Sequence, residues 1–265
     1  MDKLLVTALK TSGEVLLGYF NKPLKTKQKE SQSSIVTEAD IESEKVIINL
    51  IKASFPEHNI ISEESGFTDN KSEFTWVIDP LDGTSNFASG IPWFGILIAL
   101  FKHNTPVLGG AYLPVQDDLY LAKPGKGAFK NGEPLPLLKN KGLKESLFAF
   151  CVDYTDDIAF LNRGIETYKF IVKSSRNIRS TNSLIDFIYV AEGKLGGVLN
   201  LYTRVWDISA LGLIISEAGG LIKNINGNDI KFYVGKEIID ENFPVIAGCE
   251  NIVKSVTDFH SGKYL

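Results

Sequence analysis

Apolar residues at the N-terminal end of the chain recur at helical spacing. A helix is predicted there, ended by Asn21-Lys22-Pro23, and a second helix is predicted to open at Val36–Asp40 and close at Phe55-Pro56. The polar, lysine-rich segment between them, Lys25–Ser34, predicts either an exposed, mobile loop or the tip of a hairpin. The apolar positions that support the helices are Leu5, Ala8, Leu9, Val15, Leu16, Tyr19 and Phe20 in the first and Ile41, Ile47, Ile48 and Ile51 in the second.

Short apolar runs between turn signals follow, and they predict strands. In the first half of the chain these runs are Asn59–Ser62, Phe74–Ile78, Trp93–Phe101, Val107–Leu113 and Asp118–Ala122. Asn131-Gly132 is a strong signal for the two-residue turn of a hairpin. In the second half the predicted strands are Phe148–Val152, Gly197–Leu201 and Pro244–Gly248.

Helices alternate with these later strands. Leu184–Ala191 and Ile208–Glu217 are predicted helices, the latter ended by Gly219-Gly220, and a last helix is predicted at the C-terminus. The mixture favours an α/β (α+β) fold in which sheets are layered with helices. We expect a single domain over residues 1–265, with an N-terminal half 1–140, a C-terminal half 141–265 and a soft boundary near Lys139–Lys144.

The overall charge of the chain excludes some partners. Its formal net charge is −4, so it has no basic excess of the kind that binds nucleic acid, and an anionic substrate would have to be attracted locally, for example by bound cations. No apolar stretch approaches the ~20 residues that span a bilayer, and the N-terminus lacks the apolar core of a signal peptide. We therefore expect a cytoplasmic protein without a membrane partner.

Cysteines and histidines give no catalytic signal. Cys151 and Cys249 lie in apolar strand-like runs, which favours two buried free thiols over a disulfide. His58, His103 and His260 form no recognisable ligand pair or triad, so structural or surface roles are favoured for them.

The strongest chemical signal is the run at residues 76–87, WVIDPLDGTSNF. An apolar strand leads directly into Asp79 and Asp82, which are separated by a proline and a leucine. Asp-Pro and Asp-Gly are also common turn dipeptides. As a site, the two carboxylates would hold a hard divalent cation, Gly83 would let the backbone approach an anion, and Thr84 would add a hydroxyl.

Three further acidic runs each allow two interpretations. Glu63-Glu64 follows a predicted strand and is either a solvated edge or a ligand pair. Asp207, in Val205-Trp206-Asp207, stands where the N-cap of the Ile208–Glu217 helix is expected, and an N-cap carboxylate can also bind a metal. Thr37-Glu38-Ala39-Asp40 is equally suited to cap the second helix.

Taken together, these runs resemble the inositol monophosphatase family over nearly the whole chain. They occur in the order and at the approximate spacing of that family. The resemblance implies a layered αβαβα sandwich, usually a homodimer, that hydrolyses phosphate monoesters with Mg²⁺ and is often inhibited by lithium. The matching stretches are IVTEAD at 35–40, FPEHNIISEE at 55–64, WVIDPLDGTSNF at 76–87, GKGAFKNG at 125–132 and VWDISALGLIISEAGG at 205–220.

The resemblance also implies roles for individual residues. Two or three Mg²⁺ ions would be held by Glu63, Asp79, the Leu81 carbonyl, Asp82 and Asp207. Thr84, hydrogen-bonded to Asp40, would help activate the attacking water together with Glu63, and the amides of Gly83 and Thr84 would hold the phosphate. The metals would generate the nucleophile and stabilise the leaving group in an in-line displacement.

The substrate side departs from the family pattern. Asn200 replaces a glutamate that accepts substrate hydroxyls, and Asn182 stands before Ser183 where glycine is common. Gly196 replaces a frequent aspartate, and Lys29 is a candidate for approaching the phosphate from the Lys25–Ser34 segment. Inositol monophosphate is the favoured substrate; fructose 1,6-bisphosphate, histidinol phosphate and 3′-phosphoadenosine 5′-phosphate are alternatives. A non-catalytic binding module is the alternative of another class, disfavoured because every expected metal ligand is present.

Overall fold

Two helices near the N-terminus form one outer layer of the molecule. The computed structural model describes residues 1–23, 25–29 and 35–262, and it contains helix α1 over Asp2–Tyr19 and helix α2 over Glu38–Ser54. Thr37 caps α2 in a capping box with Asp40, as the sequence predicted. Ile41, one of the apolar positions of this helix, is 46% exposed, because α2 packs inward through the side that carries Ile47 and Ile51.

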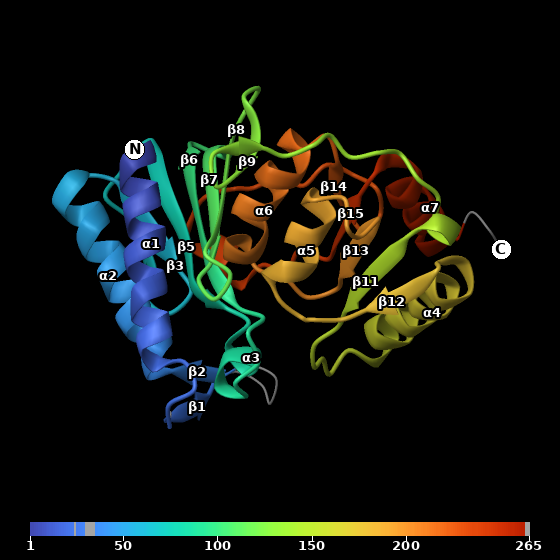
Figure 1. Cartoon of the computed structure of the whole chain (residues 1–265), viewed down its shortest axis with the longest axis horizontal. Coiled ribbons are helices and arrows are strands. Elements are labelled where there is room, and N and C mark those ends of the chain that lie inside the picture. The colour runs from blue at the N-terminus through green and yellow to red at the C-terminus, as the bar shows by residue number, and fades with distance from the viewer. Residues whose placement is uncertain (24, 30–34, 263–265) are drawn as a thin grey trace.

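An eight-stranded sheet lies under these two helices (Figure 1). Its strand order is β10-β9-β8-β7-β6-β5-β3-β4, and only β3 and β5 run parallel. The strands are β3 Asn59–Ser62, β4 Gly66–Thr68, β5 Phe74–Asp82, β6 Gly95–Lys102, β7 Thr105–Leu113, β8 Asp118–Lys123, β9 Gly127–Lys130 and β10 Glu133–Pro134.

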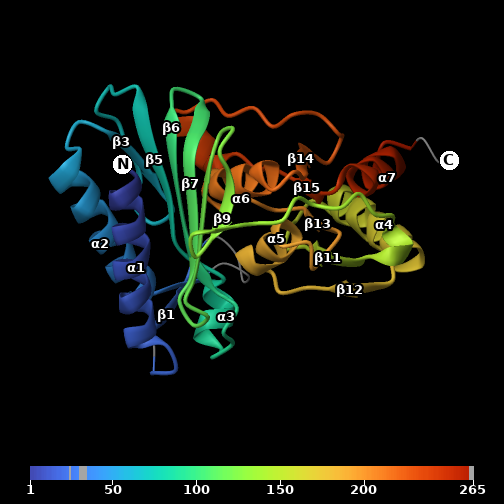
Figure 2. The ribbon, with the colours of Figure 1, turned by 45° about the horizontal axis from the view of Figure 1, so that its top comes forward.

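The second half of the chain builds a five-stranded sheet of order β12-β11-β13-β15-β14. Helices α5 and α6 lie between the two sheets, and α4 and α7 cover the outer face of the second sheet (Figure 2). The elements are β11 Leu147–Cys151, α4 Ile158–Ser174, β12 Asn177–Arg179, α5 Leu184–Ala191, β13 Gly197–Asn200, α6 Val205–Glu217, β14 Leu221–Asn224, β15 Val245–Gly248 and α7 Glu250–His260.

This arrangement is the predicted αβαβα sandwich. The hairpin turn at Asn131-Gly132 joins β9 to β10, and both residues have positive φ, as the right-handed twist of the strands requires. Strands β1, Thr26–Gln28, and β2, Ile35–Thr37, pair as a hairpin, while residues 30–34 of the predicted tip lie outside the described residues. The five-residue helix α3, Thr84–Ala88, follows β5 and was not predicted.

The helix that carries Asp207 begins earlier than predicted. Because α6 starts at Val205, Asp207 is its third residue and not its N-cap. Its carboxylate still satisfies a free amide of the first turn, since the backbone N–H of Arg204 donates to Asp207 Oδ2 at 2.6 Å.

The cysteines and histidines have the environments that the sequence predicted: buried free thiols, and histidines with structural or surface positions. Cys151 and Cys249 are buried free thiols. His58 accepts a hydrogen bond from Trp76 Nε1 at 3.1 Å, His260 is hydrogen-bonded to Thr167 at 3.0 Å, and His103 is exposed. Within the described ranges, no helix combines the length and the apolar character needed to cross a bilayer.

The contact between α1 and the sheet makes a stability prediction. A Cβ on Gly13 would lie 2.7 Å from Cδ1 of the buried Tyr112 ring, so Gly13→Ala should destabilise the protein by about 1–3 kcal/mol. Gly18 lies on the same helix with nothing within 4 Å of such a Cβ. Gly18→Ala should therefore be neutral or stabilising by up to about 1 kcal/mol. Urea unfolding of both variants tests this, and equal effects would contradict the packing described.

Candidate active site

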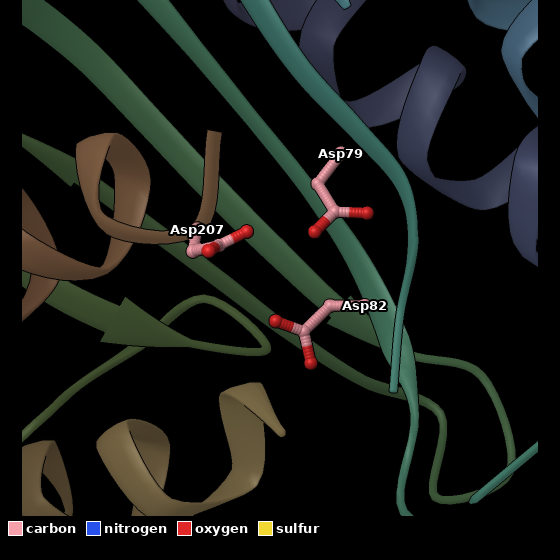
Figure 3. Close-up of side chains that lie close together, drawn as sticks. All are labelled: Asp79, Asp82 and Asp207. Carbon is pink, nitrogen blue, oxygen red and sulfur yellow. The ribbon is translucent and has the colours of Figure 1, made fainter. Parts of the chain in front are cut away.

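Three aspartates converge where β5 ends and α6 begins (Figure 3). Asp79 and Asp82 come from β5 and Asp207 from α6, and one carboxylate oxygen from each lies within 4.8 Å of the others. Residues three apart on a regular strand point to opposite faces of the sheet. Here the pairing of β5 with β6 shifts between Asp79 and Asp82, and this bulge turns both side chains toward α6.

Each aspartate is fixed by a backbone amide. Leu81 N donates to Asp79 Oδ1 at 3.0 Å, Leu184 N at the start of α5 donates to Asp82 Oδ1 at 2.6 Å, and Arg204 N donates to Asp207 as described above. These bonds orient the carboxylates and leave each of them a second oxygen. The three side chains therefore present oxygen atoms to one another with their directions already set.

Burial and mutual repulsion make this cluster costly to ionise. Burial, with the nearby charge of Glu63, raises the pKa of Asp79 well above its ordinary value, and burial with the charge of Asp82 does the same for Asp207. The pKa of Asp82 rises to about 7, chiefly because of burial. A divalent cation among the three would remove this repulsion, and an all-oxygen donor set suits a hard cation such as Mg²⁺.

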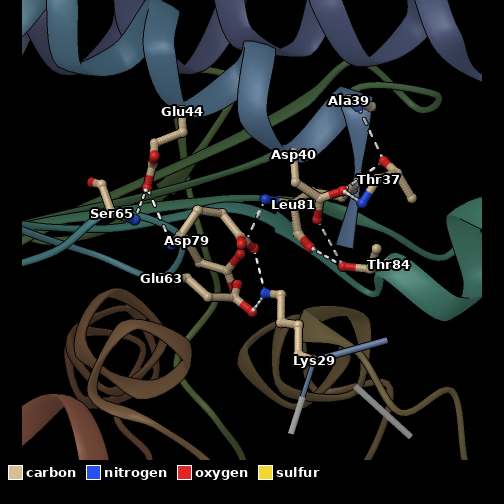
Figure 4. A network of polar contacts seen from close by, with 11 residues as sticks. Lys29, Thr37, Ala39, Asp40, Glu44, Glu63, Ser65, Asp79, Leu81 and Thr84 are labelled. Atoms are coloured by element: carbon tan, nitrogen blue, oxygen red, sulfur yellow. Dashed lines mark hydrogen bonds and ion pairs between the residues drawn. The ribbon is translucent and has the colours of Figure 1, made fainter. Parts of the chain in front are cut away.

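Glu63 faces Lys29 (Figure 4), and the neighbouring Glu64 forms an ion pair with the same lysine. Lys29 Nζ lies 2.7 Å from Glu63 Oε1 and also contacts Glu64, and the exposed fractions of the Glu63 and Glu64 side chains are 21% and 8%. The turn after β3 is held from α2, because Glu44 Oε1 accepts the amides of Glu64 and Ser65 at 3.2 and 3.1 Å. This pair is therefore not a solvated edge, and Lys29 is not part of a solvated connection.

Thr84 links the aspartate cluster to the cap of α2. Its Oγ1 lies 3.0 Å from Asp40 Oδ1 and 2.9 Å from the Leu81 carbonyl, so one hydroxyl proton is shared between two acceptors. Asp40 also accepts from the backbone N–H and the hydroxyl of Thr37 at 2.8 and 2.6 Å. Burial raises the pKa of Asp40 to about 6 against these hydrogen bonds. Asp40 thus caps α2 and faces Thr84 at the same time.

Gly83 occupies a position that only glycine fits. Its φ is +86°, and a Cβ there would lie 2.5 Å from the Trp93 carbonyl oxygen. The chain can therefore turn sharply from Asp82 into Thr84, which places both residues on the same cavity wall.

A cavity of about 520 Å³ extends from the aspartates toward the ends of β11 and β13. Asn182, Ser183 and Asn200 were predicted to contact the substrate, and all three line this cavity. Asn182 has φ +52°, a conformation that glycine and asparagine tolerate best, which accounts for asparagine where glycine is common. Asp153 and Arg204 also line the cavity and were missed by sequence reasoning.

Gly196 was wrongly placed on the substrate side. It does not line the cavity, and a Cβ at this position would lie 2.5 Å from Cδ1 of Ile252 and against Ser146. The absence of a side chain at residue 196 is a packing requirement, so it carries no information about the substrate.

Comparison with known proteins identifies the family of this chain. Residues 1–250 match the inositol monophosphatase family. The fructose-1,6-bisphosphatase/inositol-1-monophosphatase of Aquifex aeolicus is 34% identical over 79% of this chain and 80% of its own. The Nus factor SuhB of Pasteurella multocida is 33% identical over 86% of each chain. The solved structure of a Thermotoga maritima inositol monophosphatase superposes with a TM-score of 0.86, at 27% identity over 98% of this chain and 97% of that one.

The family match covers nearly the whole chain, and both relatives are matched over more than two thirds of their length. This chain therefore belongs to the inositol monophosphatase family and is a phosphoric monoester hydrolase.

Proposed function

We propose that this phosphatase hydrolyses inositol monophosphate and that Mg²⁺ is its cofactor. The observation that carries the proposal is the convergence of Asp79, Asp82 and Asp207 at one end of a cavity whose other end is lined with hydrogen-bonding groups. Such a cavity has room for a metal-bound phosphate and a small polyol.

The residues that would hold Mg²⁺ are Glu63, Asp79, Asp82, Asp207 and the carbonyl of Leu81. They offer only oxygen atoms, and the repulsion that raises the aspartate pKa values is relieved by a bound cation. When bound, Mg²⁺ lowers the pKa of water and neutralises charge on the phosphate. We propose two or three ions, as the number of carboxylates allows.

Thr84 and Asp40 form a path for the proton of the attacking water. When Thr84 Oγ1 donates to Asp40 Oδ1, its lone pairs are free to accept a hydrogen bond from a water in the cavity. Asp40, with a pKa of about 6, can take up a proton near neutral pH. Glu63, which also lines the cavity, would orient the same water, and the backbone at Gly83 and Thr84 would contact the phosphate.

A sugar bisphosphate is the second candidate substrate. Arg204 lines the far end of the cavity, and the relative from Aquifex aeolicus is named for both activities. A non-catalytic role is disfavoured because the complete set of expected metal ligands is present and its three aspartates converge.

Phosphate release from a panel of monoesters tests the proposal. We expect Mg²⁺-dependent turnover that is fastest on inositol 1-phosphate, slower on fructose 1,6-bisphosphate, histidinol phosphate and 3′-phosphoadenosine 5′-phosphate, and inhibited by lithium. Turnover on none of them, combined with no Mg²⁺ binding by calorimetry, would favour the binding module.

The oligomeric state of the protein and its cellular compartment stay predictions. We expect a homodimer, which light scattering of the purified protein would detect as twice the mass of 29.2 kDa. We expect it in the cytoplasm, which fractionation of the source cells would test.

Replacing one aspartate by asparagine should remove activity without unfolding the protein. The amide oxygen of an asparagine can still accept the backbone hydrogen bond that Asp82 or Asp207 accepts, so Asp82→Asn and Asp207→Asn should fold normally. We expect kcat to fall by about 10²–10³-fold, the range for losing one group that stabilises transition-state charge. Asp229→Asn, at an exposed position, is the control. Near-normal turnover of both site variants would contradict the assignment.

The dependence of stability on Mg²⁺ should change with pH. Raised pKa values mean that the folded state binds protons more tightly than the unfolded chain, so metal-free protein should lose stability as pH rises from about 4 to about 7. Bound Mg²⁺ removes this loss, so it should raise Tm more at pH 7.5 than at pH 5. Thermal unfolding with and without Mg²⁺ measures this. Equal Tm shifts at both pH values would show that the cation binds elsewhere.

Thr84 should affect the chemical step more than metal binding. Thr84→Ala removes the hydroxyl next to Asp40 and should lower kcat by about 10²-fold, within the range for general acid–base groups. Thr84→Ser keeps the hydroxyl and should retain most activity. Mg²⁺ affinity, measured by calorimetry, should differ little among the three proteins. If Thr84→Ala lost affinity and not kcat, Thr84 would have no role in orienting the water.

A further inference from the structure

The far end of the cavity is built from two neighbouring parallel strands. Strands β11 and β13 pair in parallel with Cys151 opposite Asn200, and Asp153 follows two residues after Cys151. Both Asp153 and Asn200 line the cavity. The carboxyl ends of parallel strands are where open α/β sheets bind their ligands, so these two side chains are placed for recognition.

Asp153 keeps a carboxylate oxygen available to a ligand. Its Oδ1 accepts a hydrogen bond from Asn182 Nδ2 at 2.9 Å. For its Oδ2 we find neither a hydrogen bond nor an ion pair with any residue in the described ranges. The side chain is half-buried, so this oxygen is partly shielded from bulk water and would gain from a hydroxyl donor.

Asn200 offers the complementary group. Its Oδ1 accepts the backbone N–H of Tyr202 at 3.0 Å, so the oxygen is already used and Nδ2 is left as a donor. An acceptor and a donor that line the same cavity match two hydroxyl groups of a polyol, because each hydroxyl can donate and accept.

We propose that Asp153 is a specificity-determining residue that accepts a hydrogen bond from a hydroxyl of the leaving group, with Asn200 donating to the adjacent hydroxyl. This rests on the proposed function and extends it. The carboxylate that the sequence lacks at residue 200 is supplied from the end of β11. A negative charge here favours a polyol monophosphate over a substrate with a second phosphate.

The substitution Asp153→Asn tests this residue with little change of shape. Asparagine keeps an oxygen for Asn182 Nδ2 and replaces only the second acceptor by a donor. Asp156→Asn is the matched control, because Asp156 also lines the cavity but is exposed and bonded to Tyr154. The control removes the same charge without removing the proposed contact.

Two substrates distinguish an effect on recognition of the leaving group from an effect on the chemical step. We expect Asp153→Asn to lower kcat/KM on inositol 1-phosphate by about 10–100-fold, mainly through KM, as for a lost hydrogen bond to a charged group. On 4-nitrophenyl phosphate, whose leaving group carries no second hydroxyl, the change should be within about twofold. Asp156→Asn should leave both values nearly unchanged. Equal losses on both substrates, or no loss on either, would overturn the proposal.

Calorimetry tests the proposed contact between Asp153 and a substrate hydroxyl independently of turnover. With Ca²⁺ in place of Mg²⁺, calorimetry should show about tenfold weaker binding of inositol 1-phosphate to the Asp153→Asn variant and unchanged binding of inorganic phosphate. Equal binding of inositol 1-phosphate to wild type and variant would overturn the role of Asp153. Absence of Mg²⁺-dependent turnover in the wild-type protein would count against the proposed function and leave this binding result standing.

Discussion

Repulsion among buried carboxylates is the constraint on which the rest of this structure depends. Asp79, Asp82 and Asp207 are held together although each raises the cost of ionising the others. Three backbone features hold the carboxylates in place: the bulge in β5, the amide hydrogen bonds to each carboxylate and the first turn of α6. These features would preorganise a cation site, because the three aspartates would need no rearrangement to bind the ion.

Residues from both sheets of the sandwich line the cavity. The first sheet supplies Asp79, Asp82 and the turn to Thr84, and the second sheet supplies Asn200 and, just beyond the end of β11, Asp153. Helix α6 lies between the sheets and carries Asp207 toward the first one (Figure 3). The three clustered aspartates on one side and Asp153 and Asn200 on the other thus come from separate elements of the fold.

Sequence patterns predicted the layers better than they predicted the site. Sheets layered with helices, the β9–β10 hairpin and the buried strands follow from local periodicity and turn residues, and the αβαβα order of the sandwich came from the family resemblance. Helix α4 was missed because its apolar residues lie on two faces, with Ile158 63% exposed and Ile171 buried. Asp207 stood at a capping position for local reasons, and only the resemblance brought it together with Asp79. Asp153 was missed because its meaning depends on which strands pair, a long-range property that residue spacing does not carry.

The central claim is that the aspartate cluster binds divalent cations. The most direct measurement is a crystal structure with Mn²⁺ in place of Mg²⁺, with the ions located by anomalous scattering. The account predicts Mn²⁺ bound directly by oxygens of Asp79, Asp82 and Asp207, with Glu63 bound to the same or a neighbouring ion. Mn²⁺ found only at surface carboxylates, with Lys29 still on Glu63 and the aspartates bare, would contradict it.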